Sequence, residues 1–336
     1  MAVQRVFVTG IAGFLGSHIA EHFLRAGSSV SGIDNLLGGN KENVPDGAEF
    51  VVADCVNREA YAGLLDGVDL VYHCAAAPWD ALSVFSPYLV HQHTATSTAA
   101  VVSLAAAASV HRFVFCSSMT RYGAQPAPFT EDQTPAPVNP YGLSKYAAEL
   151  LVRNVAETHG MEWVIAVPHN IIGPRQRFDD PYRNAAAIMI NRMLRGQRPI
   201  IYGDGLQRRS FSYVADVVDP LARLGTEPAL AGEVVNVGSD ADNVTVRQLA
   251  ELIADLVGVP FDPVYVEARP CEVRSASCCA DKARRLLGFR ERWSLRDGLA
   301  AMVDWIRASG PREFSYYLPI EILTERTPAT WTRQLI

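Results

Sequence analysis

A tyrosine and a lysine four positions apart, Tyr141 and Lys145, are the residues of this chain best suited to acid–base chemistry. If the segment that begins at Pro140 is a helix, their side chains lie on one face, one turn apart. A phenol titrates at about pH 10, but an ammonium group close by favours the phenolate and lowers the pKa of the phenol. Tyr141 could then exchange a proton with a substrate hydroxyl. Such a pair is also common at the edge of a core, so its meaning depends on the surrounding chain.

A serine is the third candidate for this chemistry. Ser118 follows the apolar segment 113–116, which we predict to be a buried strand. In a doubly wound sheet the carboxyl ends of the strands line the ligand crevice, so Ser118 is well placed to share a proton with Tyr141. An ordinary turn serine is the alternative. The proline-rich stretch 124–140 is expected to be a loop that leads into the Tyr141 helix.

Three glycines near the N-terminus have the context of a dinucleotide-binding turn. They follow the β-branched run 5–9 and precede residues 17–25, whose apolar positions have helical spacing. Gly10 permits a tight turn, Gly13 lets a pyrophosphate approach the backbone, and Gly16 lets helix and strand pack closely. The helix N-terminus also offers amide donors to phosphate. The spacing is GxxGxxG and not GxGxxG, and a glycine turn without a ligand is the alternative.

A carboxylate ends the second predicted strand, 29–33, at Asp34. It would accept hydrogen bonds from a ribose diol and repel a 2′-phosphate, which favours NAD over NADP. A plain turn aspartate is the alternative. Asp54 follows the third predicted strand, 49–52, and is expected near the adenine. Small residues that would let the cofactor lie against the backbone follow the strand 69–74: Ala75, Ala76 and Ala77.

Composition excludes several classes of function. The chain has 336 residues, 49% hydrophobic and 20% charged, as in ordinary globular proteins. Its net charge of -6 argues against a general nucleic-acid binder. Its six cysteines lack metal-ligand spacing, and we expect no metal site. No signal peptide is evident, and the longest apolar run, 99–108, is too short to span a bilayer. We therefore expect a reduced, cytoplasmic protein with no membrane partner.

The order of the predicted elements indicates the fold class. Through the first half, strands alternate with helices, including an alanine-rich helix at about 94–108. This alternation favours an α/β protein with a parallel, doubly wound sheet.

Taken together, these features resemble the extended short-chain dehydrogenase/reductase family, in its nucleotide-sugar epimerase and dehydratase branch. The resemblance covers about residues 3–305, and its motifs are highly specific in combination. They are, in chain order, Thr9-Gly10-x-x-Gly13-Phe14-x-Gly16, Asp34-Asn35-Leu36, Asp54, His73-x-Ala75-Ala76, Ser117-Ser118 with Tyr122-Gly123, Tyr141-x-x-x-Lys145, Gly173-Pro174-Arg175-Gln176 and Tyr202-Gly203-Asp204-Gly205-x-Gln207-x-Arg209.

The resemblance implies a role for each matching residue. Tyr141 would be the catalytic acid or base, Lys145 would hold the nicotinamide ribose, and Ser118 would bind the reacting hydroxyl. Thr120 would complete the catalytic set as a polar contact for either face of the sugar. NAD would contact Gly10, Gly13, Phe14, Leu15, Gly16, Asp34, Asn35, Asp54, Cys55, Ala75, Ala76, Ala77, Tyr141, Lys145 and Pro168. The UDP-sugar would contact Ser118, Thr120, Asn170, Arg177, Tyr202, Gln207, Arg209, Arg269 and Glu272. The chain departs from the family at Thr94 (usually Asn), Arg121 (usually Val) and Cys271 (usually Gly).

The resemblance also implies a domain plan. A Rossmann-like NAD-binding domain would span 1–168 and regain about 211–238, and a smaller α/β domain at 169–310 would bind the substrate. The sequence does not indicate a role for the tail, 311–336. Family members commonly dimerise through helices that correspond to about 94–108 and 142–158, so we expect a homodimer.

Two positions bear on the reaction. A 4,6-dehydratase of this branch needs a carboxylate pair where this chain has Met119 and Thr120, and decarboxylases usually carry Glu at the Thr120 position. The remaining reaction is 4-epimerisation, in which Tyr141 takes the O4 proton and hydride returns to the other face of a 4-keto sugar. A nucleotide-sugar oxidoreductase or decarboxylase is the alternative class.

The choice of sugar depends on an arginine. Arg177 matches the pattern of UDP-glucuronate 4-epimerases, in which an arginine pairs with the sugar carboxylate. We therefore expect conversion of UDP-glucuronate to UDP-galacturonate, with UDP-glucose or UDP-N-acetylglucosamine as the alternatives. Arg121 and Arg192 are further candidate cations, and a surface arginine is an equally good interpretation of Arg177.

Overall fold

A seven-stranded parallel sheet forms the centre of the protein, in a computed structural model that describes residues 4–336. Its strands are β1 (Arg5–Thr9), β2 (Ser29–Asp34), β3 (Glu49–Val52), β4 (Leu70–His73), β5 (Arg112–Cys116), β6 (Glu162–Pro168) and β11 (Val234–Val237). They lie in the order β11-β6-β5-β4-β1-β2-β3. Parallel strands are covered on both faces, and β4 and β5 are buried along their whole length. The Rossmann-like fold expected from the sequence is confirmed.

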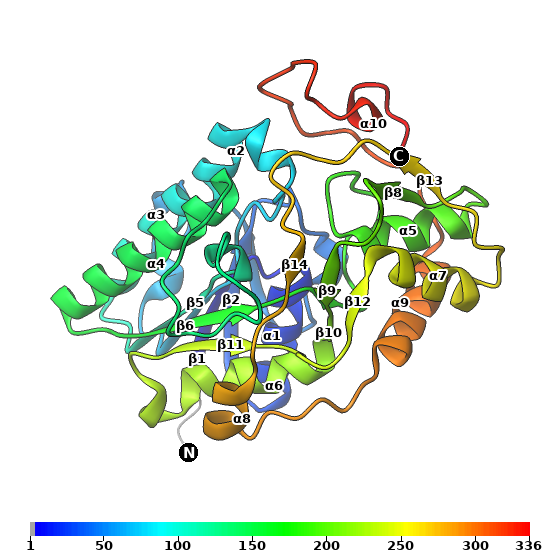
Figure 1. Ribbon diagram of the computed structural model, residues 1–336. Coiled ribbons are helices and arrows are strands. Elements are labelled where there is room, and N and C mark those ends of the chain that lie inside the picture. Colours follow the sequence, from blue (N-terminus) through cyan, green and yellow to red (C-terminus); the bar gives the residue numbers. More distant parts are fainter. Residues whose placement is uncertain (1–3) are drawn as a thin grey trace.

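Helices cover both faces of this sheet (Figure 1). One face carries α1 (Phe14–Arg25), α6 (Val214–Thr226) and α8 (Asp281–Leu287), and the other carries α3 (Ser97–Ala107) and α4 (Pro140–His159). Ile19 and Leu221 are buried between the sheet and the helices of the first face, and Val101 and Val152 are buried between the sheet and the helices of the other face. The short helix α2 (Pro87–His91), a π-helical turn at Gln92–Thr96 and α3 follow one another without a break, so helical structure begins at Pro87, before the expected residue 94.

The strand order reverses direction at β1. From β1 the chain moves to β2 and β3 on one side, and it then returns to β4 on the other side of β1. The loops after β1 and β4 therefore diverge, and the crevice between them is where open α/β sheets bind ligands. Strand β11 joins the sheet beside β6.

The rest of the chain packs around a separate core above the carboxyl end of the sheet. Its helices are α5 (Ala185–Leu194), α7 (Val246–Val257) and α9 (Leu295–Ser309), and its core includes Met189, Ile253 and Met302. Its short strands are β7 (Ile171–Ile172), β8 (Ile200–Tyr202), β9 (Arg208–Ser210), β10 (Ser212–Tyr213), β12 (Asn243–Thr245), β13 (Val264–Val266) and β14 (Ser275–Ala276). Three small sheets pair β10 with β7, β13 with β8, and β9 with both β12 and β14.

The last residues cross from this second core back toward α2, and they include the short helix α10 (Ala329–Thr332) (Figure 1). Trp331 is buried with Phe85 and Tyr182 in a fourth apolar cluster. Glu321 accepts hydrogen bonds from the backbone N–H groups of Tyr88 and Leu89. The tail is thus an ordered part of the fold. Within residues 4–336, no helix has the length and apolar character needed to cross a membrane.

Candidate active site

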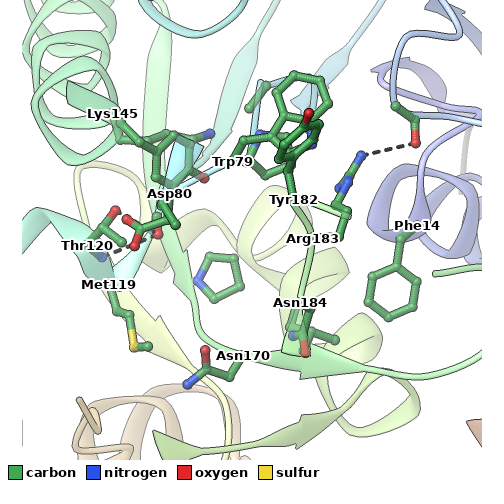
Figure 2. Close-up of a pocket in the computed structure, with 18 of the residues that line it drawn as sticks. Phe14, Trp79, Asp80, Met119, Thr120, Lys145, Asn170, Tyr182, Arg183 and Asn184 are labelled. Carbon is green, nitrogen blue, oxygen red and sulfur yellow. Dashed lines mark hydrogen bonds between the residues drawn. The ribbon is translucent and has the colours of Figure 1, made fainter. Parts of the chain in front are cut away.

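A cleft of about 510 Å³ lies between the sheet and the second core (Figure 2). Residues from the carboxyl ends of β1, β2, β4, β5 and β6 line one wall, and residues from α5, β8 and the segment 269–273 line the other. The cleft thus coincides with the crevice that the strand order predicts.

The glycine turn between β1 and α1 forms a cradle at one end of the cleft. Gly10 has φ +71°, and a Cβ there would lie 2.9 Å from the backbone nitrogen of Ala75. A Cβ on Gly16 would lie only 2.2 Å from the Gly10 carbonyl oxygen, so α1 packs against the turn in a way that only glycine allows. The N-terminus of α1 faces the cleft at this point. A pyrophosphate fits this cradle, because the backbone is bare and the helix dipole is favourable.

Asp34 stands where a ribose diol would bind. Its carboxylate accepts hydrogen bonds from the backbone N–H groups of Leu36 at 2.7 Å and Ala12 at 3.2 Å. Burial raises the pKa of Asp34, and these hydrogen bonds oppose the rise. Nearby, Asp54 accepts a hydrogen bond from the Asn35 amide at 2.7 Å. These groups fit the adenosine half of NAD, and they also line the cleft.

Most of the other expected cofactor positions also line the cleft: Gly13, Phe14, Leu15, Cys55, Ala75, Ala76 and Pro168. Ala77 is the exception, because it is fully buried and its backbone N–H donates to Thr94 Oγ1 at 3.3 Å. The assignment of Ala77 to the cofactor is therefore not supported: the chain has already turned into the core one residue after Ala76.

The first turn of α4 positions Tyr141 at the cleft. Asn139 caps the helix, with its Oδ1 accepting from the Gly142 N–H at 2.9 Å, and Pro140 occupies the first helical position. Tyr141 is 7% exposed, and Lys145 lies one turn further along and is 2% exposed. Both line the cleft together with Ser118 and Thr120. The Thr120 hydroxyl donates to Ser118 Oγ at 3.0 Å.

The electrostatics of Tyr141 differ from the expectation. Lys145 Nζ donates to the Cys116 carbonyl at 2.7 Å, and burial lowers the pKa of Lys145 to about 8. The pKa of Tyr141 is raised, first by burial and then by the negative charge of Asp80, while Ser118 acts in the opposite direction. The sequence predicted a lowered pKa for Tyr141. The sequence could not predict the raised pKa, because residue spacing reveals neither the burial of the phenol nor the nearby carboxylate of Asp80.

The opposite end of the cleft gathers the expected substrate residues. Asn170, Tyr202, Gln207, Arg209, Arg269 and Glu272 all line it. The carboxylate of Glu272 lies 3.3 Å from Arg269 and 3.8 Å from Arg209, and the Arg269 guanidinium lies 4.4 Å from the centre of the Tyr202 ring. Two arginines that converge on a concave surface suit a diphosphate.

Arg177 does not line the cleft. Its Nε lies 2.9 Å from Asp179, its Nη1 donates to the Leu37 carbonyl at 3.0 Å, and its guanidinium lies 4.3 Å from the centre of the Tyr317 ring. The expected clamp on a sugar carboxylate is therefore not supported, because neighbours from three segments hold Arg177 elsewhere.

The two further candidate cations are also structural. Arg121 forms a buried ion pair with Glu149 at 2.9 Å. Arg192 donates to the carbonyls of Arg198 and Leu335.

Sequence reasoning missed several residues that face the cleft. Arg183 donates to the Gly38 carbonyl at 3.1 Å and lies 3.3 Å from the buried carboxylate of Asp180. Trp79 also donates to Asp180, at 2.8 Å. Asp80, the next residue, faces the cleft beside this group. These residues come from loops with no motif of their own, so the sequence carried no signal for them.

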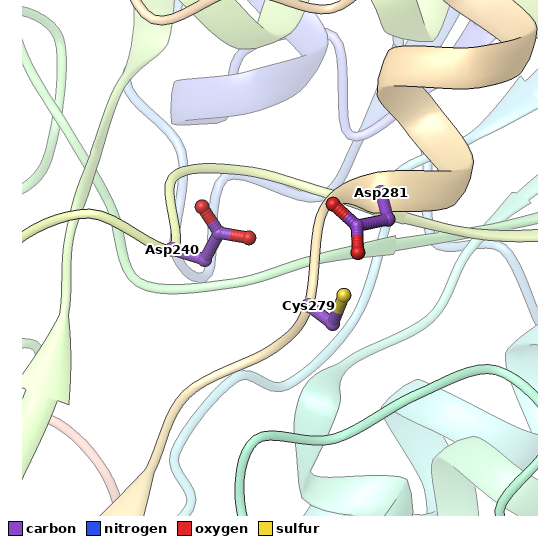
Figure 3. Close-up of side chains that lie close together, drawn as sticks. All are labelled: Asp240, Cys279 and Asp281. Carbon is purple, nitrogen blue, oxygen red and sulfur yellow. The ribbon is translucent and has the colours of Figure 1, made fainter.

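A second cluster, Asp240, Cys279 and Asp281, has the spacing of a metal site (Figure 3). Arg284 donates to both aspartates, and the Ala280 N–H donates to Asp240 at 2.9 Å. Arg284 thus already engages both carboxylates, and the cluster is part of an ion-pair network at the start of α8.

Comparisons with known proteins agree with this geometry. Residues 6–238 match the NAD dependent epimerase/dehydratase family. The UDP-glucose 4-epimerase of Mycolicibacterium smegmatis is 33% identical, over 90% of this chain and 99% of its own. The structure is similar to that of the Thermotoga maritima UDP-glucose 4-epimerase with UDP-glucose, with a TM-score of 0.85, 29% identity and coverage of 91% and 99%. It is equally similar to the Bacillus cereus UDP-glucuronic acid 4-epimerase with UDP-glucuronic acid and NAD, with a TM-score of 0.85, 28% identity and coverage of 91% and 100%.

Proposed function

Because this chain belongs to the NAD dependent epimerase/dehydratase family, we propose that it is an isomerase that inverts C4 of a UDP-sugar, with UDP-glucose as its first substrate. The observation that carries the proposal is the meeting of Tyr141, Lys145 and Ser118 in one cleft, next to a glycine cradle that fits NAD.

Each of these residues has a task in the reaction. Tyr141 takes the proton from the sugar O4, and Ser118 accepts or donates a hydrogen bond at the same oxygen. Lys145, fixed to the Cys116 carbonyl, orients the ribose next to the reacting carbon. When bound, NAD accepts a hydride from C4 and later returns it, and its positive ring favours the phenolate of Tyr141. Tyr141 then gives the proton back to O4.

The side chains at 119 and 120 support epimerisation over elimination. Dehydration would need a carboxylic acid and a carboxylate beside the sugar C5 and C6. Met119 and Thr120 line the cleft there, and neither can perform that proton transfer near neutral pH. The keto sugar therefore has one productive fate, which is reduction from the other face.

The position of Arg177 favours an uncharged sugar. A hexuronate brings a carboxylate into the cleft, and a buried carboxylate without a partner is costly. Arg177 was the expected partner, but Asp179 and Tyr317 hold it outside the cleft, and Arg183, which does line the cleft, is already paired with Asp180. UDP-glucose and UDP-N-acetylglucosamine are therefore better candidates than UDP-glucuronate.

UDP-glucuronate remains the second candidate, because Arg177 stands in the motif that suggested it and because the Bacillus cereus UDP-glucuronic acid 4-epimerase is a close structural match. If it were the substrate, Arg177 would have to leave Asp179 and enter the cleft. Arg177→Gln would then abolish conversion of UDP-glucuronate. On our proposal Arg177→Gln changes kcat/KM for UDP-glucose by less than about threefold, whereas Arg209→Gln lowers it by about 10- to 100-fold.

NMR of the purified protein, without added NAD, tests the proposal directly. We expect UDP-glucose to yield UDP-galactose, and we expect Tyr141→Phe to stop this reaction while the bound NAD is retained. Conversion of none of the three UDP-sugars, or an unchanged rate in Tyr141→Phe, would refute the assignment.

We further propose the expected division of labour and a homodimer. Residues 1–168 with about 211–238 would hold NAD, and 169–310 would hold the UDP-sugar. Apolar side chains are exposed along one side of α4, at Leu143, Leu150 and Leu151. Packing of α3 and α4 against a second copy would cover them, and light scattering that gives the mass of a monomer would exclude this arrangement.

A further inference from the structure

One carboxylate at the sugar end of the cleft, that of Asp80, forms no ion pair within residues 4–336. Asp80 is exposed, but its exposure is to the cleft that it lines. Its Oδ1 accepts a hydrogen bond from the Asn139 amide at 2.8 Å. Within residues 4–336 its carboxylate has no ion-pair partner and no second side-chain donor. Figure 2 shows Asp80 in the same part of the cleft as Thr120 and Lys145.

The other carboxylates of the cleft are all engaged. Asp34 accepts from two backbone N–H groups, and Asp54 accepts from the Asn35 amide at one oxygen and from the Val56 N–H at the other. Glu272 pairs with Arg269 and Arg209. Asp80 is therefore the carboxylate that can offer an oxygen to a sugar.

The charged groups near Asp80 show that it lies between the catalytic Tyr141 and the arginines that suit the diphosphate. Burial raises the pKa of Asp80, and Asn139, Arg269 and Arg209 oppose the rise. Asp80 in turn raises the pKa of Tyr141. A charge that acts on the catalytic phenol and on both arginines of the substrate end lies where the hexose must sit.

We propose that Asp80 selects the sugar: its second oxygen accepts a hydrogen bond from a hydroxyl of an uncharged hexose, and its charge repels the carboxylate of a hexuronate. The inference rests on the proposed function and deepens it, because it concerns the same cleft. A charged acceptor that loses its hydroxyl donor, or faces a second anion, discriminates strongly between substrates.

The substitution Asp80→Asn tests this. It keeps the shape and an acceptor for Asn139, and it removes the charge. We expect kcat/KM for UDP-glucose to fall about tenfold and kcat/KM for UDP-glucuronate to rise, so that the ratio shifts by about 100-fold. Asp80→Glu keeps the charge, and it should keep rejecting UDP-glucuronate.

The pH profile supplies a second readout. Tyr141 acts as a base only when it is deprotonated, so the rate rises with pH through its pKa. Removal of the Asp80 charge lowers that pKa, and the acid limb of kcat should move to lower pH in Asp80→Asn. In Asp80→Glu the acid limb should stay in place.

Asn139→Ser is the matched control. Serine still caps α4, but it cannot donate to Asp80 as the amide does. If Asp80 only positions α4 through Asn139, this variant will reproduce Asp80→Asn. We expect instead that it slows both sugars by the same factor and leaves the ratio unchanged.

The outcomes separate two failures. If the wild-type protein converts neither UDP-glucose nor UDP-glucuronate, the proposed function itself is wrong. If the wild-type protein converts UDP-glucose but Asp80→Asn leaves both the ratio and the acid limb unchanged, only the role of Asp80 is wrong. A wild-type preference for UDP-glucuronate would also overturn it. Retention of NAD by each variant shows that the cleft has folded.

Discussion

Tyr141 and Lys145 share a helix face, and both side chains are buried. Burial is the main cause of the shift in each pKa. The structure raises the pKa of the phenol and lowers that of the amine, so each group is held in its neutral form more than in water. With a pKa of about 8, Lys145 still carries its charge at pH 7, whereas the phenolate of Tyr141 depends on what binds in the cleft.

Lys145→Met should reveal the cost of this burial. Between about pH 8 and its ordinary value of 10.5, Lys145 is neutral in the folded protein and protonated in the unfolded chain. The unfolded state then binds more protons than the folded state. The contribution of Lys145 to the free energy of unfolding therefore rises with pH in this window. The methionine removes the titration. We expect urea unfolding of Lys145→Met to show a gain of about 2–4 kcal/mol at pH 7 over the wild type.

The comparison across pH checks the sign. The stability advantage of Lys145→Met should shrink as the pH rises from 8 to 10, because the wild-type amine is neutral there already. A constant difference in the free energy of unfolding between the two proteins over this range would show that the pKa of Lys145 is not shifted.

At the scale of elements, the turn between β1 and α1 is the most constrained segment of the cleft. Gly16→Ala places a Cβ 2.2 Å from the Gly10 carbonyl oxygen, so α1 must move away from the turn. We expect a loss of about 1–3 kcal/mol or more and a purified protein with much less bound NAD, measured by absorbance after acid release.

Gly63→Ala is the control for that change, because a Cβ there meets nothing within 4 Å. Its stability and NAD content should stay near those of the wild type. Equal effects of the two substitutions would mean that the close approach at Gly16 does not matter.

This element also shows what a sequence can predict. The strand, the three glycines and the helix are consecutive, so their geometry follows from local rules, and the same holds for the Tyr141 and Lys145 spacing on α4. Arg177 could not be placed in this way, because its position depends on Tyr317, which lies 140 residues further along the chain. The place of the Asp80 carboxylate in the cleft, with Asn139 as its hydrogen-bond donor, is likewise a product of the tertiary fold.

At the scale of the whole molecule, the tail joins the two parts that form the cleft. Tyr202, on β8, hydrogen bonds to Thr330 at 2.6 Å, and the Ile322 N–H donates to the Phe85 carbonyl at 2.8 Å. Ile336 itself lines the cleft. The tail therefore contributes to the wall of the cleft, a role that no motif in its sequence indicated.

Trp331→Ala should loosen the packing of the tail against the rest of the protein. The indole is 2% exposed and packs edge-on against Phe85 and Tyr182, so its loss leaves a cavity. We expect a loss of about 3–5 kcal/mol in urea unfolding, together with a higher KM for the UDP-sugar.

Leu323→Ala, in the same tail, is the matched control. Leu323 is 67% exposed, and its removal should change stability by less than about 0.5 kcal/mol. If Trp331→Ala were as mild as this control, the tail would not be part of the folded unit.

The central claim is that a hydride leaves C4 of the sugar and returns to the same carbon within one cleft. The most direct test supplies UDP-glucose with deuterium at C4 to the purified protein in ordinary water, with no added NAD, and analyses the UDP-galactose by NMR and mass spectrometry. The account predicts that the product keeps its deuterium at C4, because the cofactor holds the label between the two transfers. Loss of the deuterium to solvent during epimerisation would contradict it.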